Sequence, residues 1–457
     1  MSKFVKLALL FAMILGVFGV GVASAQPAGC PEGIWDEATM TAELISACAG
    51  ELAGTVVTMT GPFTDQDEVK FNEAIAPFEE WTGIDIQYTG SKEFEAAIPA
   101  AIEGGAVTDI VDFPQPGLLR RFVEGGYVID VSTFLNAEWL EQNYIQSWLD
   151  MATIAGPEGE IMAGVWNRIN GKSLVWYPIQ AWEEAGYEIP TTWDELIALN
   201  AQIVADGSSP WCVGIESGAA TGWAATDWIE EIMLRTTSLE NYDNWTIPAD
   251  AESRLLFTSP EVTNAATVLG DLWFTENNVY GGREAIASTF FGDAPLPMFE
   301  EPAGCYMHKQ GNFITSFFPE GTQPGVDYGV FYLPPIDEAY GRPFLVAGDI
   351  YSMFHDRPEV RAVMDFFSRG ESVRGWLASG GALSPHRDAS LDWYGVELER
   401  NIASLIADAT SVRFDGSDLQ PGVVGAGSFW KGMTDWISGT VDLETALAEI
   451  DAAWPTE

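Results

Sequence analysis

Residues 54–60 read Gly-Thr-Val-Val-Thr-Met-Thr, a β-branched run that predicts a strand. After it the sequence predicts an amphipathic helix over 68–81, a strand over 83–88, a helix over 92–103 and a strand over 108–112. Strands that alternate with helices at this spacing are typical of βαβ units. The N-terminal part of the chain is therefore expected to form an α/β domain around a parallel sheet.

This alternation is interrupted further along the chain. A strand-like run at 173–177 leads directly into a helix, and the pattern over 193–300 is mostly helical, with one strand expected at 212–215. Strands return at 328–333 and 344–347, and helices follow. The sequence thus predicts a second domain inserted in the first, with several chain crossings that act as a hinge.

The composition excludes some classes of function. The chain has 457 residues, enough for two or three domains, and 67 acidic against 21 basic residues give a net charge of −46. Such a surface repels a phosphate backbone, because nucleic-acid affinity depends on Lys and Arg that displace counterions. Nucleic-acid binding is therefore excluded, and most of the acids are expected to be solvated surface groups.

The N-terminus predicts export. Residues 1–25 combine two lysines, an apolar run over 7–22 and small residues at 23–25, which is the pattern of a cleaved signal peptide. The apolar run is shorter than the about 20 residues of a membrane span. A lipid-modified Cys30 is the second alternative, although Pro27 stands where lipoprotein signals have Leu.

The four cysteines fit an oxidising compartment. Their spacing matches no zinc motif, so two disulfides are expected and neither metal nor cofactor. Three pairings are possible, and the preferred one is local, with Cys30 bonded to Cys48 and Cys212 to Cys305.

Sequence motifs of common enzymes are missing. The chain contains no GxSxG, Walker, HExxH or GxGxxG motif, and its three histidines lie far apart. A glycosidase with two cleft carboxylates stays an alternative, since glycoside hydrolysis needs only two acids.

Aromatic residues in polar loops indicate a sugar ligand. Trp223 and Trp430 lie in Gly-rich stretches, and a ring face beside carboxylates and amides suits the apolar face and the hydroxyls of a sugar. The alternative is that these tryptophans pack in the core. Arg413, Asp415 and Asp418 are expected at the surface.

Several motifs resemble a known family. Residues 172–177 (Lys-Ser-Leu-Val-Trp-Tyr), 189–196 and 109–113, with the export signal, resemble extracellular solute-binding proteins of carbohydrate ABC importers. Residues 210–228 and 304–310 look like the α-glucoside-binding branch of family 1. The resemblance extends from about residue 54 to the end of the chain.

The resemblance implies a two-lobed periplasmic-binding-protein fold with an interlobe cleft. It implies a monomer in the periplasm, or on the outer face of the cytoplasmic membrane, that binds a small sugar and delivers it to permease subunits without catalysis. A surface adhesion module is the remaining alternative. The ligand contacts it nominates are Phe63, Thr64, Asp65, Asp112, Phe113, Gln115, Lys172, Tyr177, Glu216, Trp223, Gln310, Asn312, Gly348, Asp349 and Trp430.

Some of these nominations have simpler alternatives. Asp112 is of a type that often serves turns, and Glu216 precedes an expected helix, where a carboxylate is favoured by the helix dipole. The expected boundaries are 1–25 for the signal peptide, 26–52 for a leader, 53–166 for lobe 1, 167–175 for a hinge, 176–340 for lobe 2 with a return to lobe 1 near 255–345, and 341–457 for a hinge and a C-terminal helical region that packs on both lobes.

Overall fold

Two separate sheets organise the protein. The structure is a computed structural model that describes residues 27–455, so the signal peptide predicted over 1–25 lies outside the described residues. The strands are β1 (Val56–Gly61), β2 (Asp85–Gly90), β3 (Ile110–Phe113), β4 (Thr153–Gly156), β5 (Gly159–Met162), β6 (Val165–Gly171), β7 (Leu174–Pro178), β8 (Ser209–Trp211), β9 (Cys305–Lys309), β10 (Tyr328–Tyr332), β11 (Pro343–Met353) and β12 (Ser411–Phe414).

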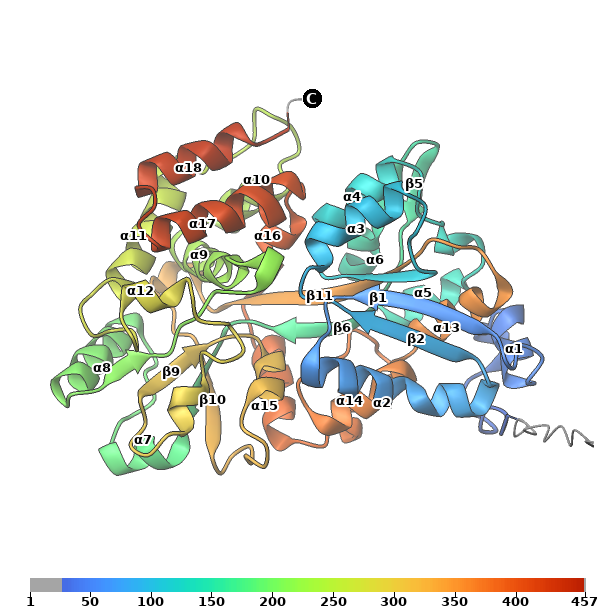
Figure 1. Cartoon of the computed structure of the whole chain (residues 1–457), viewed down its shortest axis with the longest axis horizontal. Helices are drawn as coiled ribbons and strands as arrows, with labels where there is room; N and C mark the ends of the chain where they lie inside the picture. The colour runs from blue at the N-terminus through green and yellow to red at the C-terminus, as the bar shows by residue number, and fades with distance from the viewer. Residues whose placement is uncertain (1–26, 456–457) are drawn as a thin grey trace, which may run out of the picture.

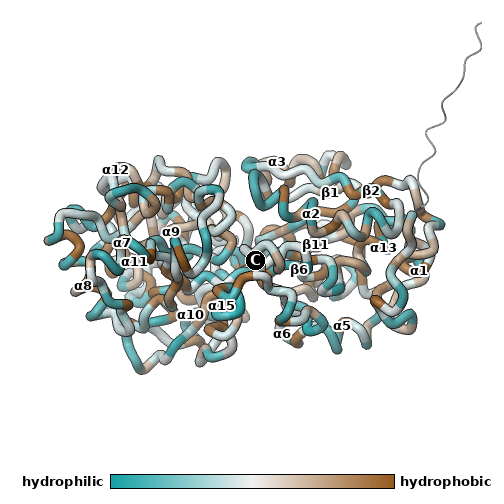
Figure 2. The backbone as a smooth tube through the Cα atoms, turned by 90° about the horizontal axis from the view of Figure 1, so that it is seen from below, coloured by the Kyte–Doolittle hydropathy of each residue, from teal (hydrophilic) through white to brown (hydrophobic). Residues whose placement is uncertain are grey.

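Helices surround both sheets. They are α1 (Ala42–Cys48), α2 (Asp65–Thr82), α3 (Phe94–Glu103), α4 (Pro116–Glu124), α5 (Ala137–Asn143), α6 (Gln146–Ala152), α7 (Ile179–Ala185), α8 (Trp193–Ala205), α9 (Trp223–Thr236), α10 (Leu239–Thr246), α11 (Pro260–Trp273), α12 (Arg283–Ile286), α13 (Pro358–Phe367), α14 (Arg374–Ser379), α15 (Glu397–Ala407), α16 (Gly416–Leu419), α17 (Trp430–Ile437) and α18 (Leu443–Ala452). Figure 1 shows two lobes side by side, with β6 and β11 reaching between them, and Figure 2 shows the same two lobes from below. The predicted two-lobed α/β fold is confirmed.

The first lobe is built on the βαβ units that the sequence predicts. Its sheet has the order β12-β11-β3-β1-β2, with β6 also paired to β11. β1 runs parallel to β2 and to β3, whereas β11 is antiparallel to β3 and to β6. The helix α2 buries Phe71, Ile75 and Phe78 at helical spacing, and Phe78 stacks on Phe366 of α13 at 4.2 Å between ring centroids.

The second lobe has its own sheet, in the order β10-β7-β9-β8, and α9 is buried along most of its length. The strand expected at 212–215 is wrong, because β8 ends at Trp211. Beyond Cys212 the chain leaves β9 and bonds the end of α12 instead, since the N–H of Ile215 donates to the carbonyl of Ile286 at 3.0 Å.

Three segments cross between the lobes and bond one another there. At the first crossing, between β6 and β7, the main-chain N–H of Lys172 donates to the carbonyl of Leu345 at 2.8 Å. The second segment leads from β10 into β11. In it the N–H of Leu345 donates to Ser173 Oγ at 2.9 Å, and the N–H of Leu333 donates to the carbonyl of Ser173 at 3.0 Å. The third segment, β12, pairs in parallel with the start of β11.

The course of the chain differs in part from the expected boundaries. The return to lobe 1 expected near 255–345 takes place only at its end, because β9 and β10 belong to the second sheet and β11 enters the first. In the C-terminal region, α13 and α14 pack on the first lobe, and α17 packs on α9 of the second.

Both preferred disulfides are confirmed. Cys30 is bonded to Cys48, with Cα atoms 4.9 Å apart, and Cys212 to Cys305, with Cα atoms 5.5 Å apart. The alternative of a lipid on Cys30 is wrong in this structure, because its sulfur is already used in the disulfide. Within residues 27–455, none of the helices combines the length and the apolar character that crossing a membrane requires.

Candidate functional site

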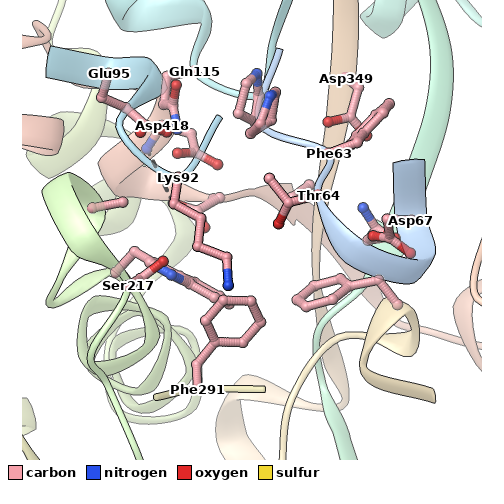
Figure 3. A pocket seen from close by; sticks show the side chains of 18 of the residues that line it. Phe63, Thr64, Asp67, Lys92, Glu95, Gln115, Ser217, Phe291, Asp349 and Asp418 are labelled. Carbon is pink, nitrogen blue, oxygen red and sulfur yellow. Dashed lines mark hydrogen bonds between the residues drawn. The ribbon is translucent and has the colours of Figure 1, made fainter. Parts of the chain in front are cut away.

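A cavity of about 160 Å³ lies between the two lobes (Figure 3). Its walls are formed by the segments after β1 and β3, by the start of α9, by the phenylalanines of two second-lobe loops, and by the crossing strands β6 and β11. A cavity of about 150 Å³ holds a six-membered ring. The space therefore suits a small ring-shaped molecule in contact with both lobes.

A first group of the sequence-predicted residues meets in this cavity. Its members are Phe63, Thr64, Gln115, Lys172, Trp223, Gly348, Asp349 and Trp430. They come from six separate parts of the chain, and the loops that follow β1 and β3 lie at one edge of the first sheet. That arrangement is the one that open α/β sheets use for ligands.

Two predicted residues of β3 lie in the core instead. Phe113 is fully buried, with its ring 5.7 Å from Phe94 and 5.9 Å from Phe122. Asp112 is also fully buried, and neither carboxyl oxygen has a partner among the described residues. Burial and the nearby Asp349 raise the pKa of Asp112 well above its usual range. The prediction of ligand contact was wrong here because β3 continues through Phe113, and the loop begins only after it.

Three others lie at the surface or the rim. Asp65 is half-exposed and pairs with Lys92 at 3.1 Å. Tyr177 packs on Trp182, with ring centroids 4.9 Å apart, away from the cavity. Glu216 accepts a hydrogen bond from the main-chain N–H of Gly218 at 2.8 Å, so the helix-start alternative describes it better than ligand contact.

Gln310 and Asn312 support the first crossing rather than the cavity. Asn312 Oδ1 accepts from the N–H of Gly171 at 2.8 Å, and its Nδ2 donates to Glu399 at 3.4 Å. Gln310 Oε1 accepts from the N–H of Gly311 at 2.9 Å. Both side chains are buried and have no place in the cavity wall.

Arg168 was missed, and it organises one wall of the cavity. Its Nε donates to Asp349 at 2.8 Å and its Nη1 to Asp67 at 3.2 Å. The guanidinium lies 4.4 Å from the ring centroids of both Phe63 and Trp376. Burial alone would lower the pKa of Arg168, but the two carboxylates raise it, so the group stays charged.

Asp415 and Asp418, expected at the surface, are buried and line the cavity. The chain turns into the cleft after β12, where Asp415 accepts from the N–H of Asp418 at 3.0 Å and caps α16. Lys172 contacts Asp415 and also lies 2.9 Å from Asp227. Burial opposes ionisation, yet Lys172 lowers the pKa of Asp415 to about 2.

The carboxylates around Lys172 are the closest approach to a metal site in the described residues. Asp227, Glu230 and Asp415 carry oxygens within 4.8 Å of one another. The cation that Asp227 and Asp415 contact is the ammonium of Lys172. Burial raises the pKa of Asp227 to about 7 and that of Glu230 well above its usual range.

Two further carboxyl groups face the cavity from opposite lobes. Glu95 comes from α3 in the first lobe and accepts from Gln115 Nε2 at 3.2 Å, while Asp418 comes from α16 in the second. Figure 3 shows Glu95, Gln115 and Asp418 on the same side of the cavity. Burial raises the pKa of Glu95 to about 7, and burial together with Asp415 raises that of Asp418 well above its usual range.

Aromatic rings form the opposite wall. Trp223 lies 5.0 Å from Phe291 and 5.9 Å from Phe313, and Phe290 and Phe317 extend this group. The phenylalanines were missed, although Phe290 and Phe291 precede a glycine in the same kind of loop that drew attention to Trp223.

Comparison with known proteins identifies the family. Residues 64–377 match the model of the bacterial extracellular solute-binding proteins. The chain belongs to this family. Among these proteins it is 40% identical over 399 residues to the osmoprotective compounds-binding protein GgtB of Synechocystis sp., an alignment that covers 87% of this chain and 92% of GgtB.

Other solute-binding proteins support the same assignment. The chain is 39% identical over 411 residues to the alpha-glucosides-binding periplasmic protein AglE of Rhizobium meliloti, covering 88% of each chain. A solved structure of a chitin oligosaccharide binding protein superposes with a TM-score of 0.71 at 16% identity, covering 87% of this chain and 97% of the other. The resemblance found in the sequence is confirmed, and these relatives are binding proteins rather than enzymes.

Proposed function

We propose that this protein captures an α-glucoside outside the cytoplasmic membrane and delivers it to the permease of an ABC importer. Two relatives support this proposal: one is named for α-glucosides and periplasmic location, the other for osmoprotective compounds. The protein acts as an exported monomer in the periplasm or at the outer face of the membrane, and it hydrolyses nothing.

The observation that carries the proposal is the chemistry of the cavity wall. Trp223 and Trp430 belong to this wall, and three residues that line the cavity each carry a buried side-chain oxygen with no hydrogen-bond partner among the described residues. These oxygens are Asp67 Oδ1, Gln115 Oε1 and Asn170 Oδ1. Buried polar atoms without partners are costly, so the ligand is expected to donate hydrogen bonds to them. The hydroxyls of a sugar meet that requirement.

The two lobes also make direct contacts that fit a ligand-closed state. Lys70 Nζ of α2 donates at 2.9 Å to Ser316 Oγ, in the segment that follows β9. The ammonium of Lys92 lies 4.4 Å above the ring of Phe290. Since a ligand that contacts both lobes binds the closed state better, it shifts the population toward closure. Small-angle scattering should therefore show compaction when the right sugar is added.

Calorimetry against free sugars tests the proposal. Pure protein titrated with maltose, trehalose and sucrose should bind at least one of them, and the same mixtures should release no glucose. Glucose release at catalytic rates would favour the glycosidase alternative. Absence of binding to every neutral sugar would favour an adhesion module, for which an apolar protein-binding patch would be needed.

A further inference from the structure

We propose that the cleft selects neutral glucosides and rejects their carboxylate-bearing analogues. The inference rests on the proposed function and makes it more specific, because it states which α-glucosides the protein excludes. It follows from how the positive and negative groups of the cavity wall are paired.

Every cation in the described wall of the cavity is already matched by carboxylates. Lys92 pairs with Asp65 at 3.1 Å. Arg168 contacts the carboxylates of both Asp67 and Asp349, so this group of three carries a net negative charge when ionised.

Lys172, at the first crossing between the lobes, repeats this arrangement. It contacts the carboxylates of both Asp227 and Asp415, and its side chain is 6% exposed. A bound anion would have to compete with carboxylates that are held in place by the fold. Burying a charge without a partner is strongly unfavourable, so this competition disfavours an anionic ligand.

Glu95 and Asp418 are two further carboxyl groups of the wall, and no cation of the wall contacts them. The partner of Glu95 is the amide of Gln115, and the charged or titratable groups around it are Glu93, Asp112 and Asp418. Around Asp418 lie Asp415, Lys172 and Asp227, with Lys172 already engaged.

These two carboxyl groups come from opposite lobes and lie on one side of the cavity (Figure 3). If these carboxyl groups are ionised, their negative charge repels an anion bound beside them. If the anion binds all the same, it favours the protonated form of both groups. In the second case binding takes up protons, so it weakens as the pH rises.

The oxygens without a hydrogen-bond partner also favour a neutral ligand over a carboxylate. Asp67 Oδ1, Gln115 Oε1 and Asn170 Oδ1 are acceptors, and they require donors from the ligand. A hydroxymethyl group or a carboxamide donates, whereas a carboxylate only accepts. The wall thus favours ligands that donate hydrogen bonds and disfavours ligands that carry a negative charge. Specificity between similar ligands arises from such a combination of favourable and unfavourable contacts.

Three ligands of nearly identical shape isolate the charge. These are methyl α-glucopyranoside, the corresponding methyl α-glucopyranosiduronamide and methyl α-glucopyranosiduronate, which differ only at C6. Calorimetry at pH 8 should give an affinity for the uronate at least tenfold below that for the uronamide. When the pH is lowered from 8 to 5.5, the ratio of the affinity for the uronamide to that for the uronate should decrease.

Variants identify the residues responsible. The double variant Glu95→Gln/Asp418→Asn should lower the ratio of the affinity for the uronamide to that for the uronate to less than threefold at pH 8. Glu93→Gln is the matched control, because Glu93 is exposed beside Glu95 and lies outside the cavity wall. It should leave the ratio unchanged.

The possible failures are distinguishable. Equal affinity for uronate and uronamide at pH 8 in the unmodified protein would overturn this inference alone, even if the double variant did not fold. Failure of every neutral glucoside to bind, including the disaccharides, would overturn the proposed function and this inference with it.

Discussion

Gly117 at the start of α4 lies directly against the main-chain carbonyl of Gln420 in the second lobe, so that a β-carbon on Gly117 would come within 1.8 Å of that oxygen. No side chain fits in such a space, and the obstacle is backbone that cannot rotate away. The closed arrangement of the lobes therefore depends on a glycine at this position, which belongs to a helix rather than to a turn.

Substitution Gly117→Ala is expected to hold the lobes apart and to weaken sugar binding at least tenfold. The stability of the protein should not fall, because alanine is favoured over glycine in a helix by about 1 kcal/mol. Calorimetry and thermal unfolding of the same sample measure both effects. Gly156→Ala is the control, since its new β-carbon would lie 3.3 Å from the nearest atom in the β4–β5 hairpin. Equal affinity in the two variants would contradict the role of Gly117 in closure.

Substitution Lys172→Met should destabilise the protein by about 3–5 kcal/mol at pH 7.5, because it leaves Asp227 and Asp415 buried without their cation. The loss should shrink at pH 5, as the carboxyl groups take up protons. Urea unfolding at both pH values measures it. Lys431→Met removes an exposed pair with Asp435 and should cost less than about 1 kcal/mol. Similar losses in the two variants would show that the buried ion pairs of Lys172 contribute no more to stability than the exposed pair of Lys431.

The two disulfides should differ in their contribution to stability. Cys212 and Cys305 close a loop with a sequence separation of 93, against 18 for Cys30 and Cys48. By loop-closure entropy, replacing the first pair by serine should cost about 4–5 kcal/mol and replacing the second about 3 kcal/mol. Urea unfolding of the two double variants tests the order. A larger loss for the N-terminal pair would mean that native-state packing, and not chain entropy, dominates.

Local patterns predicted β1, α2, β2, α3 and β3 close to where they lie, because their apolar residues repeat at strand or helix period within a short segment. The strands β6 and β9 were missed. Both bury polar side chains, such as Arg168 and Asn170 in β6 and Lys309 in β9, so neither shows the apolar alternation of an ordinary strand.

The missed site residues have the same physical origin. Arg168 and Asp415 are stabilised in the interior by partners far away in sequence, at Asp349 and Lys172. Composition alone assigns such residues to the surface, and only the fold shows the pairing that permits their burial. Sequence signals were more informative at the ends of elements, where Gln115 directly precedes α4 and Trp223 begins α9.

Glu399 should make the stability of the protein depend on pH. This carboxyl group is 2% exposed, and burial raises its pKa to about 7, against an ordinary value of 4.5. The folded state therefore binds a proton more tightly than the unfolded state between these two values. The stabilisation is complete below pH 4.5 and is lost progressively as the pH rises from 4.5 through 7, by an amount on the order of 3 kcal/mol.

Comparison of the unmodified protein with Glu399→Gln isolates this group from others that titrate nearby. The unfolding free energy of the unmodified protein should fall more steeply from pH 5 to pH 8 than that of the variant. The amide can still accept from the N–H of Gly381, which lies 2.9 Å from the carboxyl oxygen. Parallel curves for the two proteins would show that Glu399 ionises normally.

Trp430 should contribute to both stability and binding, and the two contributions can be separated. Its ring lines the cavity but is only 2% exposed, and its Nε1 donates to Ser417 Oγ at 3.2 Å. Trp430→Ala should therefore lower the unfolding free energy by about 3–5 kcal/mol, as large-to-small changes in cores do. It should also weaken sugar binding at least tenfold, since the lost stacking and apolar area exceed about 1.4 kcal/mol.

Trp436 provides the matched control within the same helix. It is 6% exposed and packs edge-on against Phe274 at 5.1 Å, outside the cavity wall. Trp436→Ala should lower stability comparably and leave the affinity of the folded protein unchanged. Calorimetry well below the melting temperature of both variants compares folded protein only. If Trp430→Ala melts early but binds sugar as tightly as Trp436→Ala does, the ring belongs to the core alone, and the sugar must stack elsewhere, with Trp223 as the remaining tryptophan of the wall.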